Sequence, residues 1–202
     1  MTLDLTCLNE FYSDIDRLRS NRLGPVIEEP RETRNKMIEF LVNNIDSKGD
    51  VLDLFSGDAV VPMALMYLQK EKRIDRKISR FYLLDNNRQK GLELSIDYAN
   101  HFELRRYFTF LEKDINNPGW SINLTDKRIN SCFMIDSVNY TVPEILIPEI
   151  RAIAPQLYVV QAGEIGKAFD SELNKYFKVK KQGIISNPSV DDLRYRVAKS
   201  IP

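Results

Sequence analysis

Short apolar runs alternate with longer amphipathic stretches along most of this chain. The runs occupy residues 51–55, 81–84, 107–111, 132–135 and 157–160. A short, continuous apolar run is typical of a parallel strand that is covered on both of its faces. The first two runs lie about thirty residues apart, which is the length of one strand–helix–strand unit. The pattern therefore predicts an α/β fold with a largely parallel sheet.

The stretches between these runs carry apolar residues at helical spacing and predict helices. Residues 4–22 and 31–45 precede the first strand, and a third helix opens with the apolar residues 60–68 directly after it. Further helices are predicted at residues 89–102, 143–153 and 171–177. Residues 177–185 and 193–201 instead indicate two strands joined by the polar loop 186–189, which predicts a hairpin at the end of the chain.

The turn after the first strand allows a ligand to come close to the backbone. Ser56, Gly57 and Ala59 are small, and Pro62 fits the first turn of the next helix, where its missing N–H is not needed. A strand, a small-residue turn and a helix in this order place free N–H groups beside the carboxyl end of the strand. We therefore expect a nucleotide-like cofactor at this turn.

Acidic residues accompany four successive strands. Asp53 lies within the first run, Asp85 ends the second, Asp114 follows the third and Asp136 follows the fourth. Parallel strands end at one edge of a sheet, and a carboxylate at the tip of the second strand can accept hydrogen bonds from both hydroxyls of a ribose. The four carboxylates predict a cofactor site along that edge.

In this order of motifs, the chain resembles the class I S-adenosylmethionine-dependent methyltransferases from about residue 33 to its end. The resemblance implies a Rossmann-like three-layer α/β sandwich, with a mostly parallel seven-stranded sheet and an antiparallel C-terminal hairpin. It also divides the chain into an N-terminal helical segment, residues 1–30, that is a candidate substrate lid, and a domain at residues 31–202 that binds S-adenosyl-L-methionine.

The resemblance assigns roles to particular residues. Asp53 and the glycine turn would hold the methionine end of the cofactor, Asp85 its ribose and Asp114 its adenine amino group. The full set of implied cofactor-binding residues is Asp53, Phe55, Gly57, Ala59, Asp85, Asn86, Asp114 and Ile115. Asp136, Asn139 and Tyr140 would face the transferred methyl group and carry catalysis by positioning the acceptor.

The chain departs from the family pattern at two places. Only Gly57 remains where the family has two or three glycines, and Asp136-Ser137-Val138-Asn139-Tyr140 lacks the prolines of the Asp/Asn-Pro-Pro-aromatic motif. A catalytically inactive relative with a binding or regulatory role is therefore the alternative function. In the same way, Asp136 or Asn139 could serve only as a cap for the helix that begins near Pro143.

The charge of the chain leaves the methyl acceptor open. Lys and Arg together number 29, as do Asp and Glu, so a nucleic-acid acceptor would require a local basic patch. One basic cluster lies within residues 70–80, where Glu71 and Asp75 interrupt it. The other comprises Lys175, Lys178, Lys180 and Lys181. Nucleic acid, a protein side chain and a small molecule all remain candidate acceptors.

The remaining composition narrows the class of protein. Cys7 and Cys132 are too few and too far apart for a metal framework, and no metal site is expected. His101, the only histidine, lies in a predicted helix and is a weak candidate for a catalytic base. No stretch is apolar enough to span a bilayer, so we expect a cytoplasmic protein without membrane contact. The oligomeric state stays open.

Overall fold

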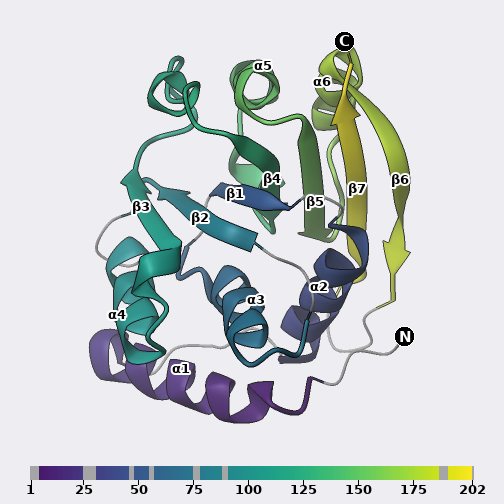
Figure 1. Cartoon of the computed structure of the whole chain (residues 1–202). Coiled ribbons are helices and arrows are strands. Elements are labelled where there is room, and N and C mark those ends of the chain that lie inside the picture. The colour runs from purple at the N-terminus through teal and green to yellow at the C-terminus, as the bar shows by residue number, and fades with distance from the viewer. Residues whose placement is uncertain are drawn as a thin grey trace.

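The computed structural model describes residues 5–24, 31–45, 48–54, 57–74, 78–87, 91–186 and 191–201. These residues form a seven-stranded sheet of order β3-β2-β1-β4-β5-β7-β6 (Figure 1). The parallel strands are β1 (Gly49–Leu54), β2 (Ile78–Asp85), β3 (Phe108–Glu112), β4 (Ile129–Ile135) and β5 (Gln156–Ala162). Two antiparallel strands, β6 (Phe177–Ile185) and β7 (Leu193–Ser200), close the sheet. The predicted mostly parallel sheet with its C-terminal hairpin is confirmed.

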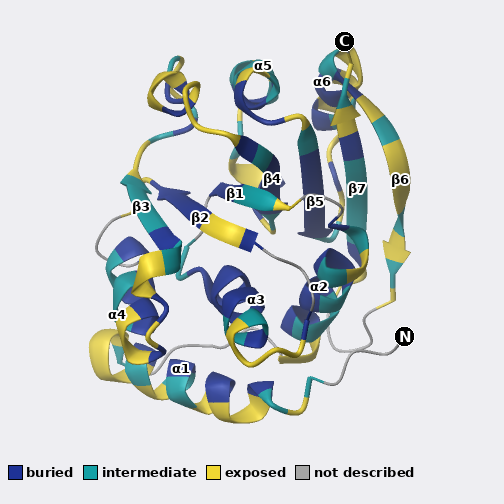
Figure 2. Ribbon diagram, in the orientation of Figure 1, coloured by how far each residue is buried: buried dark blue, intermediate teal, exposed yellow. Residues whose placement is uncertain are grey.

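Helices cover both faces of the sheet and complete the predicted three-layer sandwich. One face carries α2 (Arg31–Asn44), α3 (Val60–Lys70) and α4 (Glu93–His101), and the other carries α5 (Pro143–Ile153) and α6 (Lys167–Tyr176) (Figure 1). The first helix, α1 (Leu8–Leu23), packs outside α3 and α4. Each face buries its own hydrophobic cluster. The central strands are therefore buried along most of their length, as Figure 2 shows in dark blue.

Three helices differ by several residues from the limits predicted from the sequence. The helix expected at residues 171–177 begins earlier, at Lys167, and Phe177 belongs to β6. The helix expected at residues 89–102 has regular α-geometry only from Glu93, after a wider helical turn at Gly91 and Leu92. The first helix runs from Leu8 rather than residue 4. Each of these helices nevertheless buries an apolar face.

The strand order reverses beside β1, which is paired with β2 on one side and β4 on the other. From β1 the chain proceeds outward to β3 and then crosses back to β4. Helices therefore leave the sheet in opposite directions at this point and open a crevice at the carboxyl ends of β1 and β4, where open α/β sheets bind ligands. This crevice is therefore the candidate functional site.

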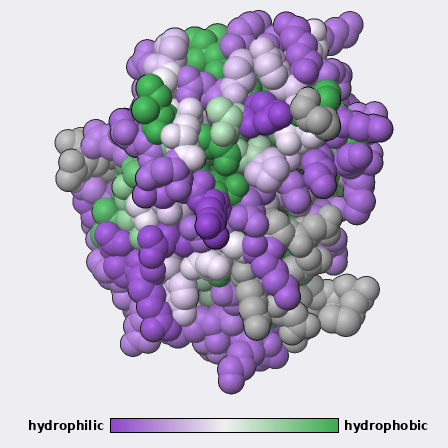
Figure 3. Space-filling view, turned by 45° about the horizontal axis from the view of Figure 1, so that its top comes forward, coloured by the Kyte–Doolittle hydropathy of each residue, from purple (hydrophilic) through white to green (hydrophobic). Residues whose placement is uncertain are grey.

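Polar side chains dominate the face of the molecule that Figure 3 shows. Figure 3 shows a largely hydrophilic face in which apolar side chains gather in a few patches. In the part of the chain that the structure describes, no helix combines the length and hydrophobicity needed to cross a membrane. The same residues contain no cluster of His, Cys, Asp or Glu that could hold a metal ion.

Candidate functional site

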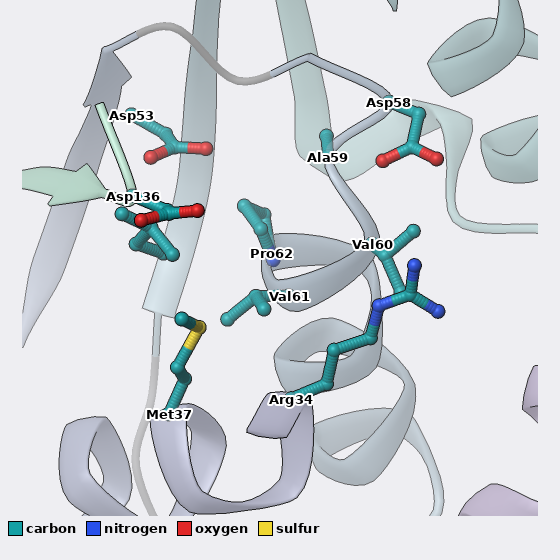
Figure 4. Close-up of a pocket in the computed structure, with 10 residues that line it drawn as sticks. Arg34, Met37, Asp53, Asp58, Ala59, Val60, Val61, Pro62 and Asp136 are labelled. Atoms are coloured by element: carbon teal, nitrogen blue, oxygen red, sulfur yellow. The ribbon is translucent and has the colours of Figure 1, made fainter. Parts of the chain in front are cut away.

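Two adjoining hollows lie at the carboxyl ends of the central strands. The inner hollow has a volume of about 120 Å³. It lies between Asp53 of β1, Asp136 directly after β4, residues 58–62 at the start of α3, and Arg34 with Met37 of α2. Figure 4 shows Asp53 and Asp136 on one side of this hollow and Arg34 rising from α2 on another. The outer hollow, about 490 Å³, extends from Gly57 past residues 85–87 to Asn116 and Tyr140. Asp136 lines both.

Asp53 is the most buried charged group of the inner hollow. Its side chain is 2% exposed, and its Oδ1 atom has no hydrogen-bond partner among the described residues. Burial, and after it the negative charge of Asp85, raises the pKa of Asp53 well above its usual value. Buried polar atoms are nearly always paired, so an unpaired carboxylate oxygen beside a hollow indicates a ligand that donates to it.

Asp85 links the second strand to the turn after the first. Its Oδ2 accepts a hydrogen bond from the Gly57 N–H at 2.9 Å, and its Oδ1 accepts one from the Asn87 N–H at 2.6 Å. Each carboxylate oxygen can accept further hydrogen bonds, and Asp85 lines the outer hollow. The side chain can therefore support the turn and bind a hydroxyl-bearing ligand at the same time.

The turn itself is held open by left-handed backbone. Gly57 and Ala59 both have φ of 51°, and a Cβ added to Gly57 would meet nothing within 4 Å. On the far side, a Cβ on Gly91 would lie 2.7 Å from the Gly57 carbonyl oxygen. Ser95 Oγ also donates to that oxygen, at 3.3 Å. Gly91 thus allows α4 to approach the turn closely, while the ligand side of Gly57 stays free.

The N-terminal helix also supports this turn. Arg19 of α1, 7% exposed, forms an ion pair with Asp58, which lines the inner hollow. Near the same end of α1, Arg22 pairs with Glu93 and Asp97 of α4. The first helix is therefore connected by charged contacts to the turn after β1 and to the helix that follows β2.

The loop after β4 is held in place by hydrogen bonds to β5. Asp136 has φ of 51°, and its Oδ1 accepts hydrogen bonds from the Ala162 N–H at 3.1 Å and from Gln161 Nε2. Gln161 Oε1 in turn accepts one from the Val138 N–H at 3.0 Å. The residue that precedes α5 is Val142, without a side-chain cap. The alternative that Asp136 or Asn139 caps this helix is therefore wrong.

Tyr140 is an exposed aromatic residue on a braced loop. Asn116 donates from Nδ2 to the Tyr140 carbonyl oxygen at 3.1 Å and accepts at Oδ1 from the Val142 N–H at 2.9 Å. Tyr140 is 71% exposed and lines the outer hollow beside Asp136. Asn139 is exposed but does not line either hollow. The backbone of the loop is thus held on both sides of Thr141, and the exposed ring of Tyr140 lies at the mouth of the outer hollow.

The structure brings most of the predicted site residues together. The inner hollow is lined by Asp53, Ala59 and Asp136, and the outer hollow by Gly57, Asp85, Asn86, Asp136 and Tyr140. Asp114 is instead bonded to the Asn116 N–H and to Asn117 Nδ2, each at 3.0 Å. The Ile115 side chain is fully buried in the core. Phe55 lies outside the described residues.

Several lining residues escaped the sequence analysis. Gly91 carries a readable signal, because a glycine at the start of a helix after the second strand indicates close backbone packing. Arg34, Asp58, Asn116 and Ser137 carry none, since their roles depend on contacts between distant segments. The same holds for Gln161, which does not line a hollow but supports the loop after β4. Cys132 is fully buried, and burial followed by the charge of Asp53 raises the pKa of its thiol, which argues against a nucleophile.

Comparisons with solved structures agree with this architecture. TrmK of M. capricolum, solved with S-adenosyl-homocysteine, has a TM-score of 0.59 and 9% identity, over 81% of this chain and 67% of its own. Sp1610 of Streptococcus pneumoniae, a proposed tRNA (m1A22) methyltransferase solved with S-adenosyl-L-methionine, has a TM-score of 0.62 and 12% identity, over 82% of this chain and 72% of its own. The PH0226 protein of Pyrococcus horikoshii OT3 has a TM-score of 0.65 and 14% identity, over 93% of this chain and 99% of its own.

Sequence comparison adds no relative. No protein-family model matches the chain, and no curated protein matches it at a significant level. The likeness is thus one of structure, and it agrees with the strand order and the antiparallel hairpin described above. The chain has the Rossmann-like fold of the class I methyltransferases.

Proposed function

We propose that this protein is an S-adenosylmethionine-dependent methyltransferase whose cofactor lies along the two hollows. The observation that carries the proposal is the unpaired, buried Oδ1 of Asp53 in a hollow that leads past Asp85 to Tyr140. Two of the similar structures were solved with S-adenosyl-homocysteine or S-adenosyl-L-methionine. The order of polar groups along the hollows supports the same ligand.

The inner hollow fits the amino-acid end of the cofactor. Asp53 offers an unpaired acceptor for an ammonium group, while the buried Arg34 provides a positive charge on α2 for a carboxylate. Further along, Asp85 suits the ribose hydroxyls, and Asn86 and Asn116 line the larger outer hollow, where a purine ring would fit. The donors and acceptors of this chain therefore match the cofactor from one end to the other.

When bound, the cofactor supplies an electrophilic methyl group on a sulfonium. The contribution of the protein is then to place an acceptor nitrogen in line with that group, which requires orientation more than a strong base. Asp136 can accept a hydrogen bond from an acceptor N–H, because its Oδ2 is not engaged by the bonds that fix its Oδ1. The exposed Tyr140 ring can stack on a planar acceptor.

We propose a nucleobase of RNA as this acceptor. A flat ring that stacks on Tyr140 while its edge bonds to a carboxylate fits the way in which proteins read unpaired RNA bases. Sp1610, which has the same fold, is itself a proposed tRNA methyltransferase. Protein side chains and small molecules are the competing acceptors, and a direct assay distinguishes them.

Cofactor binding is tested by calorimetry with S-adenosylmethionine, S-adenosylhomocysteine and NAD in parallel. Asp85→Ala removes an acceptor for the ribose hydroxyls, and each such bond to a charged group is worth about 1.5 to 3 kcal/mol, so affinity should fall at least about tenfold. Asp126→Ala, an exposed carboxylate paired with Lys127 away from the hollows, is the matched control and should bind as the parent does. Unchanged affinity in folded Asp85→Ala would exclude this site.

Turnover is tested by transfer of a tritiated methyl group to cell extract separated into RNA, protein and small-molecule fractions. Asp136→Ala should retain S-adenosylhomocysteine binding and lose roughly a hundredfold in rate, since a displacement of about an ångström can cost that much. Label in the protein or small-molecule fraction would overturn the RNA acceptor. Confirmed cofactor binding without label in any fraction would favour the inactive relative.

A further inference from the structure

The C-terminal hairpin concentrates positive charge in a chain whose net charge is zero. Its strands β6 and β7 carry the basic residues Lys178, Lys180, Lys181, Arg194, Arg196 and Lys199 and not a single acidic residue. Elsewhere, acidic residues therefore outnumber basic ones. This local excess is the kind of basic patch that a polyanion requires in a neutral protein.

Of the six basic residues of the hairpin, only the two arginines form ion pairs within the described structure. Arg194 pairs with Glu164, and Arg196 holds both carboxylate oxygens of Asp170, at 3.1 and 2.8 Å. The described residues provide no ion-pair partner for Lys178, Lys180, Lys181 or Lys199, which we call the hairpin lysines. Lys181 makes a neutral contact, from Nζ to Asn44 Oδ1 at 3.1 Å. Within the described part of the chain, these four lysines therefore have no acidic side chain in ion-pair contact.

The register of the hairpin brings these charges together. Lys178 lies directly opposite Lys199 in the antiparallel pair, and like charges in this position are destabilising. The ladder then shifts between Val179 and Lys181, so that Lys181 pairs with Val197, two residues from Lys199 along β7. Alternate residues of a strand share a face, and the shift therefore places Lys181 on the face that carries Lys178 and Lys199.

Protection of the sheet edge explains only part of this arrangement. Lysines and a bulge on an edge strand discourage pairing with another chain, and β6 is the edge strand. Lys199, however, lies on β7, which is paired on both sides. A lysine there does not guard an edge, and its position opposite Lys178 costs stability. An anion bound across the hairpin would relieve the repulsion.

We propose that the hairpin lysines bind the sugar-phosphate backbone of the RNA whose base is methylated. This inference rests on the proposed function and identifies a second contact with its substrate. Ile185 of β6 and Leu193 of β7 lie at the sheet edge that carries the hollows, since Ala162 at the end of β5 pairs with Leu193, which in turn pairs with Ile185. Lys178 and Lys199 lie at the opposite ends of β6 and β7, and a strand rises about 3.3 Å per residue.

That separation argues for a large polyanion. Strand β6 contains 9 residues, which corresponds to about 30 Å from one end to the other. A free nucleotide cannot contact the hollows and the far hairpin lysines together, whereas a folded RNA can. The lysines would supply affinity without base specificity, because contacts to phosphate position an RNA but do not read its sequence.

The test is fluorescence anisotropy with labelled single-stranded RNA and with unfractionated tRNA over a series of salt concentrations. The double variant Lys178→Gln/Lys199→Gln should bind about tenfold more weakly and lose about 1.4 from the slope of log affinity against log salt, at roughly 0.7 for each phosphate contact to a single strand. Lys127→Gln/Lys113→Gln removes the same charge outside the hairpin and should change both values little.

Three outcomes would overturn the proposal. The first is an equal RNA affinity and salt slope in the double variant and the parent. The second is a double variant that keeps its RNA affinity and only self-associates more than the parent by light scattering, as edge protection requires. The third is a parent that binds anionic phosphatidylserine vesicles and not RNA. The affinity of the parent and of each variant for S-adenosylhomocysteine is measured in parallel by calorimetry. A double variant that binds the cofactor but not RNA supports the hairpin contact. A parent that does not bind the cofactor contradicts the proposed function, and the RNA measurements then test the hairpin contact independently of it.

Discussion

Strained residues concentrate at the site. Among the described residues, Ala59, Lys72, Glu103 and Asp136 have positive φ without being glycine, and Ala59 and Asp136 line the same inner hollow. A left-handed conformation is unfavourable for a residue with a Cβ, and such residues cluster at functional sites. The turn therefore keeps a glycine-like backbone at Ala59, although the sequence has lost the glycine.

Replacement of Ala59 by glycine should stabilise the protein. In an ordinary helix, replacement of an exposed Ala by Gly lowers the free energy of unfolding by about 0.5 to 1 kcal/mol. At Ala59 the backbone is left-handed, with φ of 51°, and this conformation reverses the sign. We therefore expect Ala59→Gly to raise the free energy of unfolding by about 1 kcal/mol. Urea denaturation measures this, with Ala152→Gly on the exposed side of α5 as the destabilising control. Cofactor affinity should hold or rise; a fall would mean that the Ala59 methyl packs against the ligand.

The protonation of Asp53 should depend on folding and on the ligand. Its pKa is raised in the folded chain, first by burial and then by the charge of Asp85. The folded state therefore holds a proton that the unfolded state has released, and stability falls as pH rises from the ordinary Asp value of about 3.9 toward the raised value. A ligand ammonium favours the ionised form and should expel that proton on binding.

Calorimetry in buffers with different ionisation enthalpies detects the expelled proton. We expect S-adenosylhomocysteine to release protons from the parent at a pH below the raised pKa of Asp53, and to release none from Asp53→Asn, which cannot titrate. Asp50→Asn, near the other end of β1, is the control and should release as many protons as the parent. Equal proton release from Asp53→Asn and the parent would assign the proton to another group.

At the scale of elements, α5 holds the loop that supports Tyr140. Glu149 of α5 accepts hydrogen bonds from the Ser121 hydroxyl, the Gly119 N–H and the Ser121 N–H. Burial opposes ionisation of Glu149, but these bonds outweigh it and lower the pKa. Their stabilisation is therefore complete above the ordinary Glu pKa and is lost as pH falls through the lowered value.

Glu149→Gln should destabilise the loop in the neutral range. A neutral amide offers one acceptor oxygen where the carboxylate offers two, so we expect a loss of about 1 to 3 kcal/mol and a weaker dependence of stability on acid. Guanidinium denaturation at neutral and acidic pH measures both. Glu144→Gln, exposed on the same helix, should change neither, and an equal loss in both variants would point to helix charge instead.

The elements that could be predicted are those whose signal is local. The hairpin strand β6 has the predicted limits, and β7 ends one residue early at Ser200, because alternating residues and a polar loop define a hairpin over a short stretch. The supports of the site are different. Asn116 bonds residues 24 and 26 positions away, and Gln161 bonds one 23 positions away. Such contacts exist only after folding, so no local pattern indicates them.

The whole molecule joins the N-terminal helix to the domain core. Phe11 of α1 is 1% exposed and packs against Tyr67 and Phe102, with ring centroids 5.1 and 4.6 Å away. Leu8, Tyr12 and Ile15 enter the same hydrophobic cluster. Displacement of this helix would expose its buried apolar face to water and would cost free energy. The proposed lid function of residues 1–30 stays a prediction, and the packing favours α1 as a fixed brace.

Hydrogen exchange distinguishes a brace from a lid. If α1 is a fixed part of the core, its amides should open only with global unfolding and be protected as strongly as those of β4, whereas a lid would exchange by local opening at lower free energy. Phe11→Ala should then lower the stability of the entire chain by about 3 to 5 kcal/mol in one cooperative transition. Leu23→Ala, on the exposed end of the same helix, is the control with a small effect. Rapid exchange confined to α1 in the parent, with Phe11→Ala leaving β4 protection intact, would establish the lid instead.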